Sequence, residues 1–159
     1  MTWQSNYWDS LKAVIAASWP EMVGRPYPAL RRDVAMERVN WGNLIQEGKL
    51  AAPWVIVQIK YETATDGPAN WPSYNVFATI WYVAEVLNED SATAVLTIEG
   101  KLETLRQAMM IDQTLGTTYS EAPIDTSAEN PVNETFLFQQ VPFQAGSITF
   151  QTLVVAVTQ

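Results

Sequence analysis

The fold is decided by the stretch at residues 54–63, WVIVQIKYET, in which apolar and polar side chains alternate. Val55 and Ile59 fall on one side of an extended chain, and Lys60 and Glu62 fall on the other. Alternation of this kind is typical of a β-strand with one face in the core and one face in solvent. We therefore predict a half-buried strand over residues 54–63.

A longer strand is predicted at residues 73–87, after the turn-forming sequence DGPANWP at residues 66–72. Both faces of this strand are apolar. The face opposite the main tyrosine, valine and isoleucine stripe carries Phe77, Trp81, Val83 and Leu87. A strand that is apolar on both faces is either covered on both sides or in contact with another chain. A helix of the same chain and a second subunit are equally good candidates for covering this face.

Two amphipathic helices are predicted, at residues 5–19 and 91–112. Their apolar positions recur at helical spacing and so share one face of each helix. These positions are Trp8, Leu11, Ile15 and Trp19 in the first helix, and Val95, Ile98, Leu102, Leu105 and Met109 in the second. Ser5 is the expected N-cap of the first helix, and Pro20 ends it. Gly100 costs the second helix roughly 1 kcal/mol relative to alanine unless close packing requires a glycine.

The segments between these elements are less regular. Residues 20–31 contain three prolines and a glycine and predict a connection. Residues 32–50 fit either a short strand followed by a loop or a helix, and we prefer the strand. Residues 116–133 are polar and contain two prolines, which predicts a long loop or arm.

Two further strands are predicted at residues 134–140 and 147–158, joined through residues 141–146. The order is helix, uncertain element, two strands, helix, two strands. Strand hairpins combined with separate helices indicate an α+β fold in one domain over residues 1–159. We expect a two-layer sandwich, with a mainly antiparallel sheet of about four strands and two helices packed on one face.

The chain contains no histidine and no cysteine. Histidine is the usual general base near neutral pH, and cysteine supplies thiolate nucleophiles and most structural zinc ligands. The glycines form no phosphate-binding loop. Asp125 and Glu129 come closest to a catalytic carboxylate pair, but they lie in an irregular polar segment. We therefore expect a protein that is not an enzyme, with no catalytic residues, no cofactor and no bound metal.

The net charge of −8 argues against binding of nucleic acid through its phosphates. Residues 107–159 carry five acidic and no basic side chains. This acidic surface either aids solubility or forms a wall that DNA passes without sticking. The basic cluster is explained by ion pairs with neighbouring acids, and its alternative role is docking onto an acidic partner. Its members are Arg25, Arg31, Arg32 and Arg38.

No stretch approaches the roughly 18 apolar residues of a membrane-spanning helix. The N-terminus lacks the basic region and cleavage pattern of a secretion signal. The absence of cysteine fits a reducing compartment. We expect no membrane partner.

Four stretches of the chain resemble the phage tail terminator family, whose members are also described as neck, tail completion or head-tail joining proteins. They are the helix Tyr7–Trp19 followed by PE, the sequence APWVIV at residues 52–57, the strand Asn75–Glu85 leading through an acidic turn to KLETLR at residues 101–106, and FQAGSITF at residues 143–150. Together these stretches span most of the chain.

The resemblance implies a non-enzymatic viral structural protein that forms a homo-oligomeric ring, typically a hexamer. Such a ring caps the finished tail tube, ends tail polymerisation and joins the tail to the head connector. The implied partners are other copies of the chain, the tail tube protein and the head connector protein, while DNA passes through without specific binding. The implied location is the host cytoplasm during assembly and the tail or neck region of the virion afterwards.

On this hypothesis, three groups of residues are candidate contacts. They are Phe77, Trp81 and Val83 on the second face of the long strand, Arg31 and Arg32 in the basic cluster, and Tyr119 and Asp125 in the segment 116–133. If the first group forms the ring contact, Trp81→Glu abolishes assembly and leaves a folded monomer.

Three alternatives stay open. Another head-tail connector, such as a stopper or adaptor, would share this class of sequence and differ in its partner. A small-ligand-binding α+β domain would use the many aromatic residues to line a pocket. A hydrolase that uses Asp125 and Glu129 is the most distant alternative.

Overall fold

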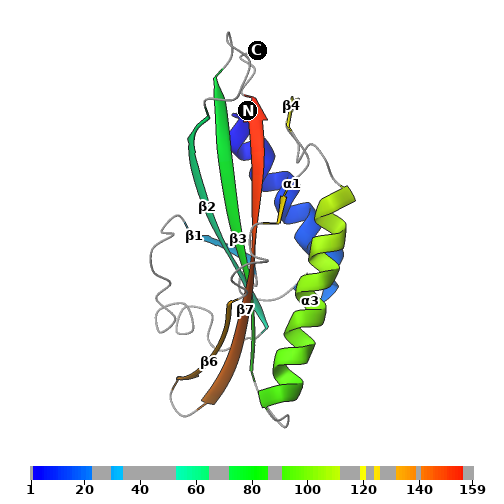
Figure 1. The fold of residues 1–159 in the computed structure, drawn as a ribbon. Helices are drawn as coiled ribbons and strands as arrows, with labels where there is room; N and C mark the ends of the chain where they lie inside the picture. The colour runs from blue at the N-terminus through cyan, green and yellow to red at the C-terminus, as the bar shows by residue number, and fades with distance from the viewer. Residues whose placement is uncertain are drawn as a thin grey trace.

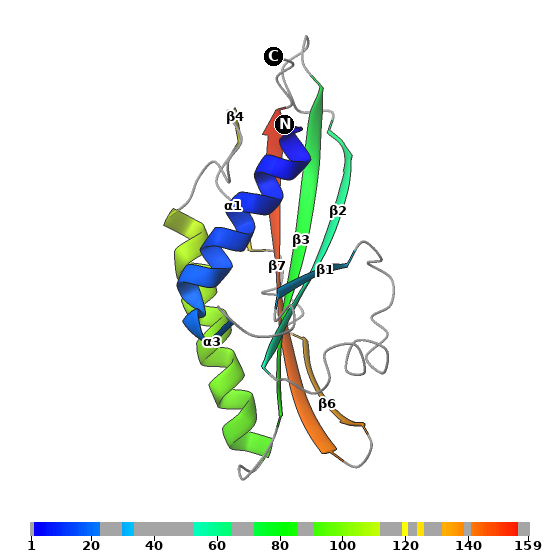
Figure 2. The same ribbon diagram turned by 180° about the vertical axis from the view of Figure 1, so that it is seen from behind.

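The structure is a computed structural model, and it describes residues 2–22, 30–33, 53–64, 72–85, 91–111, 119–120, 124–125, 132–138 and 141–155. Two helices pack against one face of a long antiparallel sheet (Figure 1). Figure 2 shows both helices on the same side of the sheet from behind. The predicted α+β class, with two helices in contact with a mainly antiparallel sheet, is confirmed.

Three long strands form the centre of the sheet. They are β2 (Trp54–Thr63), β3 (Ser73–Glu85) and β7 (Val141–Val155). β3 lies between the other two and is antiparallel to both, and Ile80 pairs with Val57 on one side and Ile148 on the other. The limits of β2 are those predicted from its alternation. The described part of the predicted strand 73–87 ends at Glu85.

Short strands extend this sheet at both edges. β1 (Leu30–Asp33) runs parallel to β2, beside residues 55–58. Along its other edge, β7 pairs with β6 (Val132–Phe138), β5 (Ile124–Asp125) and β4 (Tyr119–Ser120). Within the described residues, the sheet therefore has seven strands, where the sequence predicted about four. The three that were missed, β1, β4 and β5, are too short to show a period.

The predicted connection at residues 141–146 is wrong, because these residues form the first part of β7. β6 and β7 form a hairpin in which Leu137 pairs with Pro142 and Asn133 pairs with Gly146. Proline and glycine are typical of turns, which explains the error. A proline near the beginning of a strand removes one donor and is tolerated there.

Helix α1 (Trp3–Ser18) begins before its predicted limit. The hydroxyl of Thr2, not that of Ser5, accepts the capping hydrogen bond, and its donor is the backbone N–H of Ser5. Ser5 was therefore the wrong N-cap. The helix ends at the predicted place, where the backbone N–H of Trp19 donates to Ile15 and the short 3₁₀ helix η1 (Pro20–Met22) follows.

Helix α3 (Ser91–Ile111) matches the second predicted helix within the described residues. Together the two helices and the sheet enclose one core. The helices contribute Tyr7, Leu11, Ile15, Trp19, Ile98, Leu102, Leu105 and Met109 to this core. The sheet contributes Val55, Val57, Ile59, Val76, Ala78, Ile80, Tyr82, Ile148, Phe150 and Val154. Each large apolar side chain buried in this way stabilises the fold by roughly 1.5–3 kcal/mol. The predicted apolar stripes are thus buried, apart from Trp8 and Val95, which are half-buried.

Gly100 lies on the exposed side of α3, and a Cβ atom added there would meet nothing within 4 Å. The chain itself therefore does not require a glycine at this position. We expect Gly100→Ala to raise the free energy of unfolding by about 1 kcal/mol through helix propensity. Thermal unfolding would then shift upward by roughly 2–4 °C for a chain of this size. A lower melting temperature would show that the methyl group meets an obstacle.

Several sequence-based predictions lie outside the described residues. These include the segment 34–50, Arg25, Arg38, Leu87 and Glu129. The described residues within the segment 116–133 pair with β7, so at those positions the chain belongs to the sheet.

Candidate interaction surfaces

The sheet has a second face, directed away from the helices, which we call the rear face. It is formed by Trp54, Ile56 and Gln58 of β2, Phe77, Thr79, Trp81 and Val83 of β3, and Phe143, Ala145 and Ser147 of β7. Trp54 and Phe143 stack with ring centroids 5.5 Å apart. β2 is buried on both faces over its first six residues and exposed only over its last four. The prediction of a half-buried strand is therefore wrong for the first six residues of β2. Alternation of apolar and polar side chains cannot show whether the more polar face is covered by other parts of the protein.

The strand register brings the three predicted contact residues of β3 to the rear face, and their exposure differs. Val83 is fully buried, Trp81 is 8% exposed, and Phe77 is half-buried. The indole N–H of Trp81 donates to the side-chain oxygen of Gln58 over 3.0 Å, and Gln58 is itself buried. A neighbouring subunit on this face would therefore reach Phe77 more easily than the other two.

The other four predicted contact residues lie on edge strands. Arg31 and Arg32 are in β1, opposite Ile56 and Val57 of β2. Tyr119 is in β4 and Asp125 is in β5, and both strands pair with β7. In the order of strands, β1 and β4 stand at opposite ends of the sheet. The structure thus divides these residues between two edges and does not bring them into one site.

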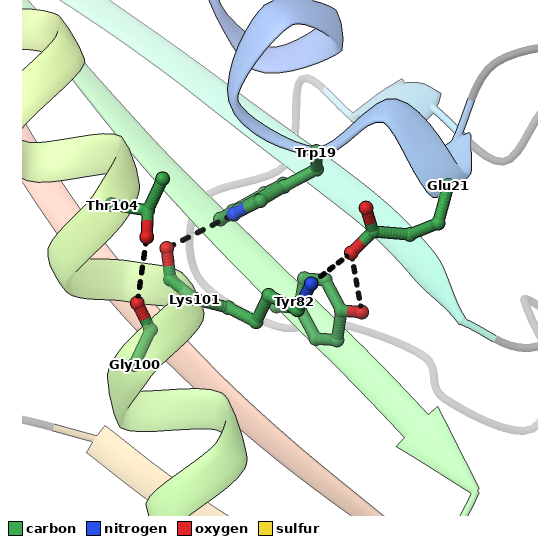
Figure 3. A network of polar contacts seen from close by, with 6 residues as sticks. All are labelled: Trp19, Glu21, Tyr82, Gly100, Lys101 and Thr104. Atoms are coloured by element: carbon green, nitrogen blue, oxygen red, sulfur yellow. Dashed lines mark hydrogen bonds and ion pairs between the residues drawn. The ribbon is translucent and has the colours of Figure 1, made fainter.

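A polar network joins the end of α1 to α3 and β3 (Figure 3). The indole N–H of Trp19 donates to the backbone carbonyl of Lys101 over 2.9 Å. The ammonium group of Lys101 lies 2.7 Å from the carboxylate of Glu21, and the hydroxyl of Tyr82 donates to the same carboxylate over 3.0 Å. The rings of Trp19 and Tyr82 meet edge to face, with centroids 5.0 Å apart. This network links the C-terminal end of α1 to α3 and to β3 of the sheet. No sequence pattern predicted it.

In the described part of the chain, two titratable groups have shifted pKa values. Partial burial pushes the pKa of Glu21 upward, but the hydrogen bonds from Lys101, its own backbone N–H and Tyr82, together with the charge of Lys101, outweigh burial and lower it. Burial strongly raises the pKa of Tyr7, an effect that the neighbouring Thr152 hydroxyl partly offsets. Tyr7 is therefore a neutral core side chain at physiological pH.

The contact between Glu21 and Lys101 predicts a pH dependence of stability. Because the pKa of Glu21 is lowered on folding, its contribution is fully present above the ordinary carboxyl pKa of 4.5 and is lost as the pH falls through the lower folded-state value. We expect Glu21→Gln to lower the free energy of unfolding by about 0.5–1 kcal/mol at pH 7. Urea unfolding from pH 7 to pH 3 would show this difference shrinking below pH 4.5. A difference that is independent of pH would contradict the ion pair.

Among the described residues, no group of three or more histidine, cysteine or acidic side chains could hold a metal ion. Several aromatic rings pack against one another. Examples are the pairs Trp19 with Tyr82 and Trp54 with Phe143. In the part of the chain that the structure describes, no helix is long and apolar enough to cross a membrane.

Comparison with known proteins finds a similarity in fold to solved structures. No protein-family model matches the chain, and no curated protein matches it either. Among solved structures, a chain of the virion of the native gene transfer agent (GTA) particle has a similar fold, with a TM-score of 0.54 and 13% sequence identity. The match covers 98% of this chain and 96% of that chain. The two chains therefore share the α+β fold over almost their entire lengths.

Proposed function

We propose that this protein is a structural component of a phage-like virion and that it acts there as a tail terminator. In this role, copies of the chain form a ring with the six members typical of the family it resembles. The ring caps the tail tube, stops its polymerisation and joins it to the head connector. The observation that supports this most is the end-to-end similarity in fold to a chain of the gene transfer agent virion. The sequence resemblance to tail terminators supports the finer assignment.

The charge distribution is consistent with this role. Four of the five acidic residues beyond residue 106, where the chain has no basic residue, fall within residues 119–155, the range from β4 to β7, and Asp112 precedes this range. A surface of this sign repels DNA, as the lining of a DNA conduit must. A closed ring also needs two different contact surfaces on each subunit, because neighbours meet head to tail. Arg31 and Arg32 at one edge of the sheet and Tyr119 and Asp125 at the other are candidates for these surfaces.

The test is electron microscopy of particles made without the gene for this protein. Tails of uncontrolled length beside DNA-filled, tailless heads would support the terminator role. Heads that lose DNA beside tails of normal length would instead assign the protein to the head side, as a stopper or adaptor. Normal infectious particles would contradict a role in virion assembly.

A further inference from the structure

In the ranges that the structure describes, the outer edge of β2 is paired over only part of its length. β1 pairs with residues 55–58, and in the part of the chain that the structure describes no strand pairs with the outer edge of Ile59–Thr63. Figure 1 shows β1 beside the lower part of β2, so that the upper part forms the margin of the sheet. An edge of this kind presents unpaired backbone N–H and C=O groups, which can accept another strand.

The side chains along this open edge are exposed and arranged in a simple pattern. Lys60 and Glu62 lie on the rear face, and neither forms an ion pair with another described residue. Tyr61 lies between them on the helix side and is 46% exposed. Its ring is held edge to face against Trp3 at 5.2 Å and Tyr74 at 5.7 Å. The edge thus carries one basic and one acidic group on the same face, and a fixed aromatic ring on the other.

We propose that a second copy of the chain pairs with this edge, strand β2 against strand β2, about a two-fold axis at Tyr61. In this antiparallel register, Lys60 lies opposite Glu62 of the partner subunit, and Glu62 lies opposite Lys60 of the partner subunit. Opposite charges at directly paired positions stabilise a sheet, and the contact contains this pair twice. The two copies of Tyr61 meet on the helix side.

The charges also select this register over its neighbours. A shift of the two-fold axis to residue 60 places Lys60 against Lys60, and a shift to residue 62 places Glu62 against Glu62. Like charges at paired positions destabilise a sheet. Charged residues on an edge strand often serve to prevent pairing. Here the opposite charges of Lys60 and Glu62 attract one another across the contact only when the two-fold axis lies at Tyr61.

This contact goes beyond the proposed function and does not depend on it. A two-fold contact uses the same surface on both subunits, whereas neighbours in a ring meet through different surfaces. The dimer inferred here is therefore a property of the purified protein, whether or not it ends a tail.

The experiment is sedimentation velocity on the purified full chain over roughly two decades of concentration. We expect a dimer whose share increases with concentration and decreases with added salt. Lys60→Glu and Glu62→Lys each place two like-charged pairs in the contact, and we expect each to weaken dimerisation by about tenfold or more. Mixing the two variants restores both attractive pairs, so a heterodimer forms.

The matched control is Lys12→Glu, which makes the same change of charge at an exposed position of α1. It should dimerise like the wild type, and circular dichroism should show that all three variants are folded. A wild type that stays monomeric at all concentrations would overturn the proposal. An assembly that neither Lys60→Glu nor Glu62→Lys weakens would also overturn it, while leaving a ring contact elsewhere unaffected.

Discussion

Trp81→Glu is expected to unfold the protein. Trp81 is only 8% exposed, and its indole N–H donates to the buried side chain of Gln58. Truncation of a buried tryptophan costs about 3–5 kcal/mol. Burial of a carboxylate in its place costs further free energy, and the hydrogen bond from Trp81 to the Gln58 oxygen is lost. Because small domains are stable by only about 5–15 kcal/mol in total, these losses leave little of the folded state.

Near-ultraviolet circular dichroism and urea unfolding would measure this effect. Trp81→Phe is the conservative control, since it keeps an aromatic ring and removes the hydrogen bond, and we expect it to remain folded. Phe77→Glu is the matched control on the same strand face, and we expect a smaller loss because Phe77 is half-buried. A folded Trp81→Glu monomer that no longer assembles would contradict our expectation and support the ring contact inferred from the sequence.

The sequence predicted the helices and strands in which apolar side chains recur at regular spacing. β2 was predicted with its correct limits, and the apolar stripes of α1 and α3 lie in the core. The rear face was recognised as apolar, but a period cannot show whether such a face is buried within the chain. The burial of Val83 and Trp81 therefore became known only from the structure.

The elements that were missed have different physical causes. β1, β4 and β5 have four residues or fewer, too few for alternation to be recognised. The first part of β7 was assigned to a turn because Pro142 and Gly146 are typical of turns. Thr2 and Ser5 are both good N-cap residues, and only the backbone geometry distinguishes them.

The polar network could not have been predicted from the sequence. Trp19 and Lys101 are far apart in the chain, and the acceptor in their hydrogen bond is a backbone carbonyl, which every residue carries. Glu21 and Tyr82 come together with Lys101 only after both helices have packed on the sheet. Contacts of this kind depend on tertiary arrangement and leave no local pattern.

Trp19→Ala is expected to give the second large effect. Trp19 is fully buried, and its ring meets Tyr82 of β3 while its N–H donates to α3. Loss of the ring should lower the free energy of unfolding by about 3–5 kcal/mol through lost burial and the cavity that remains. An edge-to-face aromatic pair contributes about 0.5–1.5 kcal/mol beyond its buried area, so the upper part of that range is expected. The melting temperature should fall by roughly 10 °C or more.

Two variants separate the contributions of Trp19. Trp19→Phe keeps a ring beside Tyr82 but removes the donor to Lys101, so we expect a loss of about 1–2 kcal/mol. Trp8→Ala removes the same type of side chain from a half-buried position of the same helix and should cost clearly less than Trp19→Ala. If Trp19→Ala unfolds at nearly the wild-type temperature, the end of α1 is not anchored to α3 and β3. If it costs several times as much as Trp8→Ala, Trp19 anchors the end of α1 to both α3 and β3, because its N–H donates to Lys101 and its ring contacts Tyr82.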